Sequence, residues 1–141
     1  MIRSKTLTDA IRAELSKYPL YSQDGKGGDA VAVCRLFLTG TAAAFYITEG
    51  QPNGEYEGRE NWELFGVSNL ERGEGWRYDY FSLAELDGLN LYGGLVHLEN
   101  DATFTPRPLR DIPELVADLA DLWRADVEAA TEDDDDLDGD A

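Results

Sequence analysis

The chain has 141 residues, of which 43% are hydrophobic, so it is long enough and apolar enough to bury the core of one domain. Its 29 acidic and 12 basic residues leave a net charge of −17, which repels nucleic acid and anionic membranes and favours positively charged partners. The single cysteine excludes an intramolecular disulfide and a zinc site made of cysteine pairs. Because we find neither a signal peptide nor a stretch near the roughly 20 apolar residues of a membrane span, we expect a cytoplasmic protein.

The first half of the chain is expected to form a short helix followed by strands. Apolar residues recur at helical spacing over residues 6–18, and Pro19 ends that helix. Two apolar runs, 31–38 and 43–48, predict a pair of strands joined by a tight turn. The polar, glycine-containing segment 50–61 predicts an exposed connection.

The second half is expected to add more strands and a short helix. Ser82 and Glu85 have the spacing of a capping box, in which the hydroxyl of the first accepts a hydrogen bond from the amide of the second. This pattern predicts a helical turn that ends at Gly88. Four segments have the apolar and aromatic content of strands: residues 62–70, 76–81, 95–98 and 103–104.

A longer helix is predicted near the C-terminus, with its start at Ile112 and Pro113. Seven apolar residues at helical spacing predict one buried stripe along it: Ile112, Leu115, Val116, Leu119, Leu122, Trp123 and Val127. Residues 131–141 are mostly acidic, so we expect a disordered tail there and a single domain over residues 1–130. The order of elements predicts an α+β fold, with a mostly antiparallel sheet of about four to six strands packed by an N-terminal helix and a longer C-terminal helix.

The C-terminal helix carries a row of carboxylates on one face: Glu114, Asp118, Asp121 and Glu128. Like charges at such spacings cost a helix a few tenths of a kcal/mol each, so stability alone does not favour them. One interpretation is an ordinary solvated surface. The other is a surface that imitates the phosphates of nucleic acid and occupies a basic groove of a partner protein. We add the acids of the polar segment, Glu55, Glu57 and Glu60, to this candidate partner-binding set.

Candidate chemistry is sparse in this chain. His97 is the only histidine and lies in an apolar run, so a structural role is favoured and the usual nitrogen and sulfur metal sites are not available. Glu49, Glu99 and Asp101 fall at predicted strand ends and could together hold magnesium or calcium. A small metal-dependent hydrolase or nuclease-like enzyme using these three residues is therefore the alternative function. Cys34 is expected in the core, and no motif indicates a cofactor.

Several short segments resemble one family when they are taken in order. They are Tyr46-Ile47-Thr48-Glu49, Phe65-Gly66-Val67, Tyr80 to Leu86, and Leu98 to Asp101 with Phe104 and Pro106. The family comprises small proteins of bacteria, plasmids and phages designated domain of unknown function 2958 (DUF2958). The resemblance covers about Leu20 to Leu109, and an arginine is common in the family where Asn100 stands here. It implies a protein of a mobile genetic element and no established activity.

Together these observations lead to one expected function. We expect a non-enzymatic acidic interaction protein of a phage or mobile element, in which carboxylates block a basic surface of a host nucleic-acid-binding or defence protein. An anti-CRISPR or anti-restriction protein would act in this way. We expect no direct contact with nucleic acid or membrane, no cofactor and no metal, and the oligomeric state is left open.

Overall fold

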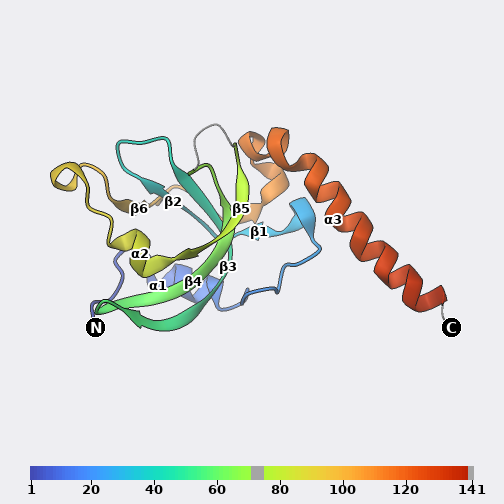
Figure 1. The fold of residues 1–141 in the computed structure, drawn as a ribbon, viewed down its shortest axis with the longest axis horizontal. Coiled ribbons are helices and arrows are strands. Elements are labelled where there is room, and N and C mark those ends of the chain that lie inside the picture. The colour runs from blue at the N-terminus through green and yellow to red at the C-terminus, as the bar shows by residue number, and fades with distance from the viewer. Residues whose placement is uncertain (71–74, 140–141) are drawn as a thin grey trace.

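A computed structural model describes residues 1–70 and 75–139, with side chains up to Ala129. Its centre is a five-stranded antiparallel sheet in the order β5-β4-β3-β2-β6 (Figure 1). These strands are β2 (Cys34–Leu38), β3 (Ala44–Tyr56), β4 (Arg59–Ser68), β5 (Arg77–Ser82) and β6 (Leu98–Asn100). A second, two-stranded sheet pairs β1 (Val31–Ala32) with β7 (Arg107–Pro108).

The helices confirm the predicted α+β class. They are α1 (Asp9–Leu15), α2 (Leu83–Asp87) and the long α3 (Pro113–Gly139), with single 3-10 turns η1 (Gly27–Asp29), η2 (Tyr92–Gly94) and η3 (Leu109–Asp111). Figure 1 shows that α3 leaves the body of the protein and ends far from the sheet. Among the described residues, no helix combines the length and the apolar character that crossing a membrane requires.

Each face of the sheet covers its own hydrophobic core, because neighbouring residues of a strand point to opposite faces. On β3, Phe45 and Ile47 join a cluster that contains Leu15 of α1 and Leu83 of α2. Tyr46, which lies between them, joins a second cluster with residues of α3: Leu115, Leu119 and Trp123. The sheet is therefore sandwiched between the short helices on one face and α3 on the other.

Residues 51–58 of the segment 50–61 are exposed as predicted, but the prediction that this segment connects two elements is wrong. β3 continues to Tyr56 and β4 begins at Arg59, so this segment is the far half of one long hairpin. Glu57 and Gly58 form its turn, both with positive φ (50° and 77°), which is the backbone of a type I′ turn. Residues 51–56 are exposed on both faces of the hairpin, so they lack the alternation of apolar and polar residues that identifies a strand.

Other predicted elements differ from the structure mainly in their limits. The helix predicted over 6–18 spans only α1, and the strand predicted over 31–38 divides into β1 and β2 at Val33. The predicted strand at 103–104 is wrong, because the pairing is made by β7 instead. The N-cap at Ser82 is confirmed, since its hydroxyl accepts from the Glu85 amide at 3.3 Å, and Gly88 caps the end of α2 as predicted.

The predicted apolar stripe of α3 is only partly buried. Ile112, Leu115, Leu119 and Trp123 are buried, and α3 begins at Pro113 as predicted. Three members of the stripe are 37–52% exposed: Val116, Leu122 and Val127. Helix α3 continues past residue 130, the predicted end of the domain. Because no side chain after Ala129 is described and residues 140–141 lie outside the described part, the disordered tail over 131–141 stays a prediction.

Candidate functional site

The acidic row on α3 divides into two parts with different roles. Glu114 accepts a hydrogen bond from the Tyr46 hydroxyl, and Asp118 accepts one from the Trp76 amide at 2.9 Å. Burial, reinforced by the Glu114 carboxylate, raises the pKa of Tyr46 to about 12. These two carboxylates therefore attach the first half of α3 to the sheet, so that neutralising them also disturbs the fold.

The second part of the row faces solvent. The Asp121 side chain is 94% exposed, and within the described residues its one ion pair is with Arg124 of the next helical turn, at 3.4 Å. Glu128 is exposed and has no hydrogen bond or ion pair within the described residues. Asp126, which the sequence analysis did not select, is also exposed on this part of the helix. These exposed carboxylates, of which Asp121 has only a solvent-exposed partner on the same helix, remain available to another molecule.

The three acids predicted on the polar segment also separate. Glu60 is bound within the fold, because its carboxylate accepts from Arg12 at 2.6 and 3.0 Å and from the Trp62 indole at 2.9 Å. Glu55 and Glu57 are exposed near the end of the β3–β4 hairpin. This hairpin and α3 lie on opposite sides of the molecule (Figure 1). The predicted partner-binding residues therefore do not form one continuous surface.

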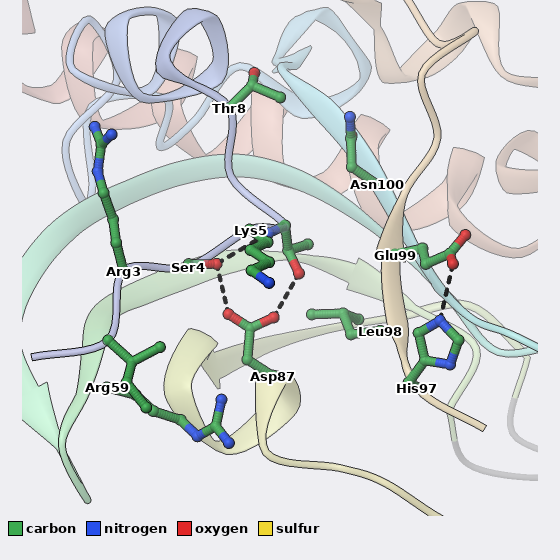
Figure 2. Close-up of a pocket in the computed structure, with 12 residues that line it drawn as sticks. Arg3, Ser4, Lys5, Thr8, Arg59, Asp87, His97, Leu98, Glu99 and Asn100 are labelled. Atoms are coloured by element: carbon green, nitrogen blue, oxygen red, sulfur yellow. Dashed lines mark hydrogen bonds and ion pairs between the residues drawn. The ribbon is translucent and has the colours of Figure 1, made fainter. Parts of the chain in front are cut away.

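A cavity of about 600 Å³ lies elsewhere, between the N-terminal segment, α2 and β6. Figure 2 shows Arg3 and Arg59 on one side of Asp87, and His97 with Glu99 on the other. Sequence reasoning missed this cavity, because its walls come from segments far apart in the chain. Arg3, Lys5 and Arg59 line it together with two acids, Asp87 and Glu99, so the lining carries a small excess of positive charge.

Asp87 is central to this cavity but is used by the fold. Its carboxylate, seen beside Ser4 in Figure 2, accepts from the hydroxyls of Ser4 and Thr6, both at 2.5 Å. These bonds hold the N-terminal segment against α2. We therefore interpret the cavity as the seam along which the N-terminal segment attaches, and we assign no chemistry to it.

His97 forms a pair with Glu99 at the edge of the same cavity. Its Nε2 lies 2.8 Å from the Glu99 carboxylate, and its Nδ1 lies 2.7 Å from the Gly94 carbonyl oxygen. Both ring nitrogens thus face acceptors, an arrangement that suits the doubly protonated ring. The Glu99 carboxylate, followed by the Gly94 carbonyl, accordingly raises the pKa of His97 above 6.5.

We expect Glu99→Gln to lower the pKa of His97, because the neutral amide no longer stabilises the imidazolium. The change can be followed by an NMR pH titration of the only histidine in the chain. In the unsubstituted protein the pair stabilises the fold fully below pH 6.5, and this contribution is lost as pH rises through the raised pKa. Glu85→Gln, which removes an exposed acid of α2, is the control and should leave the titration unchanged. An unaltered His97 pKa in Glu99→Gln would contradict the assignment.

The three carboxylates of the alternative function line three different cavities. Glu99 lines the cavity just described, Glu49 lines one between the sheet and α3, and Asp101 lines a third. Asp101 pairs with Arg35 at 3.4 Å and accepts from the Thr103 hydroxyl at 2.6 Å. Within the described residues, no group of three histidine, cysteine or acidic side chains is placed to hold a metal ion. These carboxylates therefore cannot bind one ion together in this arrangement.

The fold and the exposed acids define a small α+β protein with an acidic C-terminal helix. The chain belongs to the DUF2958 family of proteins of unknown function, whose family model matches residues 6–120. The match extends beyond the predicted Leu20–Leu109 and includes α1 and the start of α3. Glu114 and Asp118 thus lie inside the matched region, whereas Asp121 and Glu128 follow it. No curated protein and no solved structure shows significant similarity to the chain.

Proposed function

We propose that the protein binds a basic surface of another protein through the exposed part of α3. The partner is a host nucleic-acid-binding or defence protein, and the carboxylates of the helix take the place of phosphates in its groove. In this proposal the chain is a non-enzymatic interaction protein of a phage or mobile element. The alternative enzymatic function is not carried forward, since Glu49, Glu99 and Asp101 line separate cavities.

The observation that carries the proposal is the position of the acids relative to the end of the core. Among the residues of α3 whose side chains are described, Trp123 is the last buried one, and residues 124–129 are exposed. This stretch and the turn before it present Asp121, Asp126 and Glu128 against a single base, Arg124. Because none of these three acids binds the body of the protein through a hydrogen bond or ion pair in the described structure, a partner can pair with them without disturbing the fold.

The spacing of charge along the helix also supports the proposal. Asp121 to Glu128 is seven residues, or about 10 Å of helix axis at about 1.5 Å per residue. Three exposed acids, Asp121, Asp126 and Glu128, lie on this length, which gives about one carboxylate per 5 Å, against about one phosphate per 3.4 Å in one DNA strand. A groove lined by lysine and arginine to hold phosphates would meet a similar density of negative charge here.

The test compares two double substitutions that remove the same charge from different surfaces. Asp121→Asn with Glu128→Gln neutralises exposed acids of α3, and Glu55→Gln with Glu57→Gln neutralises the hairpin. Proteins captured from host lysate at low salt are purified, and their affinity for each variant is measured with and without double-stranded DNA. Loss of two exposed ion pairs should weaken binding about fivefold to tenfold for the α3 variant only.

If the proposal holds, added salt and added DNA should each weaken the complex with the captured partner. Binding should weaken as salt is raised, because ion pairs are screened, and DNA should compete for the captured partner. An equal loss in the hairpin variant would indicate a response to net charge rather than to the α3 surface. An affinity for the partner that changes neither with salt concentration nor on addition of DNA would overturn the proposal. Glu114 and Asp118 are left intact, since they attach α3 to the sheet.

A further inference from the structure

A second cavity, of about 380 Å³, lies between the sheet and the inner side of α3. Three carboxylates line it, from the loop before η1, from β3 and from α3: Asp24, Glu49 and Asp126. Its other walls include aromatic and apolar side chains: Phe65, Tyr78, Leu122 and Trp123. Among the described lining residues none is basic, so the cavity is strongly negative with partly apolar walls. Its volume is in the usual range of small-molecule sites.

Glu49 is the deepest acid of this cavity, with only 2% of its surface exposed. Its two oxygens accept from the amides of Tyr21 and Gln23 at 2.7 and 2.9 Å. A carboxylate has about four acceptor positions, so each oxygen retains capacity for another donor. Among the described residues no basic side chain forms an ion pair with Glu49. Buried carboxylates are normally paired with a cation, hydrogen-bonded or neutralised. Burial raises the pKa of Glu49, whereas the charge of Lys26 opposes this shift, so a cationic ligand would add the direct ion pair that the described residues do not form.

Tyr78 and Trp123 join the two walls of the cavity. The Trp123 indole donates to the Tyr78 hydroxyl at 2.7 Å, and the Tyr78 ring stacks on Phe65 with ring centres 5.6 Å apart. Burial raises the pKa of Tyr78, and the charges of Asp126 and Glu49 add to this effect. All three residues line the cavity. Aromatic side chains beside carboxylates are the usual surroundings of bound organic cations.

We propose that this cavity binds an organic cation, an alkylammonium or guanidinium group, with Glu49 at its base and Asp24 and Asp126 at its rim. The group would be either a free amine or the side chain of a lysine or arginine of another protein. The absence of basic lining residues in the described structure disfavours an anion. The aromatic walls suit an organic cation better than a strongly hydrated metal ion. Of the exposed carboxylates of α3, this proposal uses only Asp126, which also lines the cavity; Asp121 and Glu128 are not part of it.

The experiment titrates the full chain by calorimetry with agmatine, which carries a guanidinium and an ammonium group, and with 1-pentanol as a neutral comparison. Agmatine should bind and pentanol should not. Asp126→Asn should weaken agmatine binding about threefold to tenfold, because it removes one negative charge from the rim. The substitution breaks no hydrogen bond of the described structure, so the fold should be retained. Asp121→Asn, the same change on the outer side of α3, is the matched control and should leave agmatine binding unchanged.

Glu49→Gln is a second variant, in which the loss of binding should be larger than in Asp126→Asn if the thermal unfolding midpoint is retained. If Glu49→Gln fails to fold, the comparison of Asp126→Asn with Asp121→Asn still tests whether the cavity binds agmatine.

A short capped peptide with one arginine identifies the source of the cation. Tighter binding of the peptide than of agmatine indicates a protein side chain, and tighter binding of agmatine indicates a free amine. Failure of both to bind, or equal weakening in both aspartate variants, would overturn the proposal. The double variant Asp121→Asn with Glu128→Gln separates the two proposals, because it should lose affinity for the protein partner and keep its affinity for agmatine.

Discussion

Gly66→Ala is expected to destabilise the protein by about 3 kcal/mol or more and to leave much of it unfolded. A Cβ at this position of β4 would lie 2.0 Å from the Tyr46 carbonyl oxygen and 2.9 Å from the Ile47 Cα. Both atoms belong to the backbone of β3, which cannot move aside by changing a rotamer. The strands would have to separate in the middle of the sheet. Urea and thermal unfolding measure the loss.

Gly54→Ala provides the matched control on the same hairpin. Gly54 has a positive φ of 62°, but a Cβ there would meet nothing within 4 Å. Only the strain of the left-handed backbone is then expected, about 1–2 kcal/mol. An equal loss of stability in the two variants would show that close approach of the backbones is not what Gly66 provides.

Removing one partner of the Arg12–Glu60 pair is expected to have the second large effect. Both side chains are largely buried, at 14% and 13% exposed, and their closest contact is 2.6 Å. The pair joins α1 to β4, and the Ser4 amide also donates to Glu60 at 2.9 Å. Arg12→Met or Glu60→Gln should each cost about 2–3 kcal/mol, because the remaining charge keeps its burial and loses its partner.

The pH dependence of stability tests the same pair. The hydrogen bond from Arg12 lowers the pKa of Glu60 from 4.5 to about 2. Hydrogen bonds from the Trp62 indole and the Ser4 amide make smaller contributions in the same direction. A lowered pKa in the folded state means that the stabilisation is present above pH 4.5 and is lost as pH falls through about 2. Unfolding followed across this window should show a flatter dependence on pH in Glu60→Gln than in the unsubstituted protein.

The surface pair of Glu14 and Lys17 is the control for this experiment. It has a similar contact distance, 2.9 Å, but its side chains are 42% and 64% exposed. Glu14→Gln should therefore cost less than about 0.5 kcal/mol. If it cost as much as Glu60→Gln, burial would not explain the strength of the Arg12–Glu60 pair.

Much of the fold could be predicted because its signals are local. The N-cap at Ser82 and the start of α3 at Pro113 depend on neighbours within one helical turn. The strands around Phe45 and Leu64 are buried on at least one face, so they carry apolar residues that reveal them. The far half of the β3–β4 hairpin lacks this signal, since residues 51–56 are exposed. Its strand pairing comes from the turn at Glu57 and Gly58 and from the long partner strand.

The sequence by itself determined the net charge of −17, the α+β order of elements and the place of a long acidic helix at the C-terminal end. Only the tertiary structure decided which carboxylates the fold uses. Glu114 and Asp118 bind groups of the sheet, and Glu60 binds Arg12, from which it is separated by 48 residues. Local spacing cannot reveal such partners, because a carboxylate in a row looks the same whether it meets solvent or a distant donor. The sheet brings those donors to one half of α3 and leaves Asp121 and Glu128 exposed.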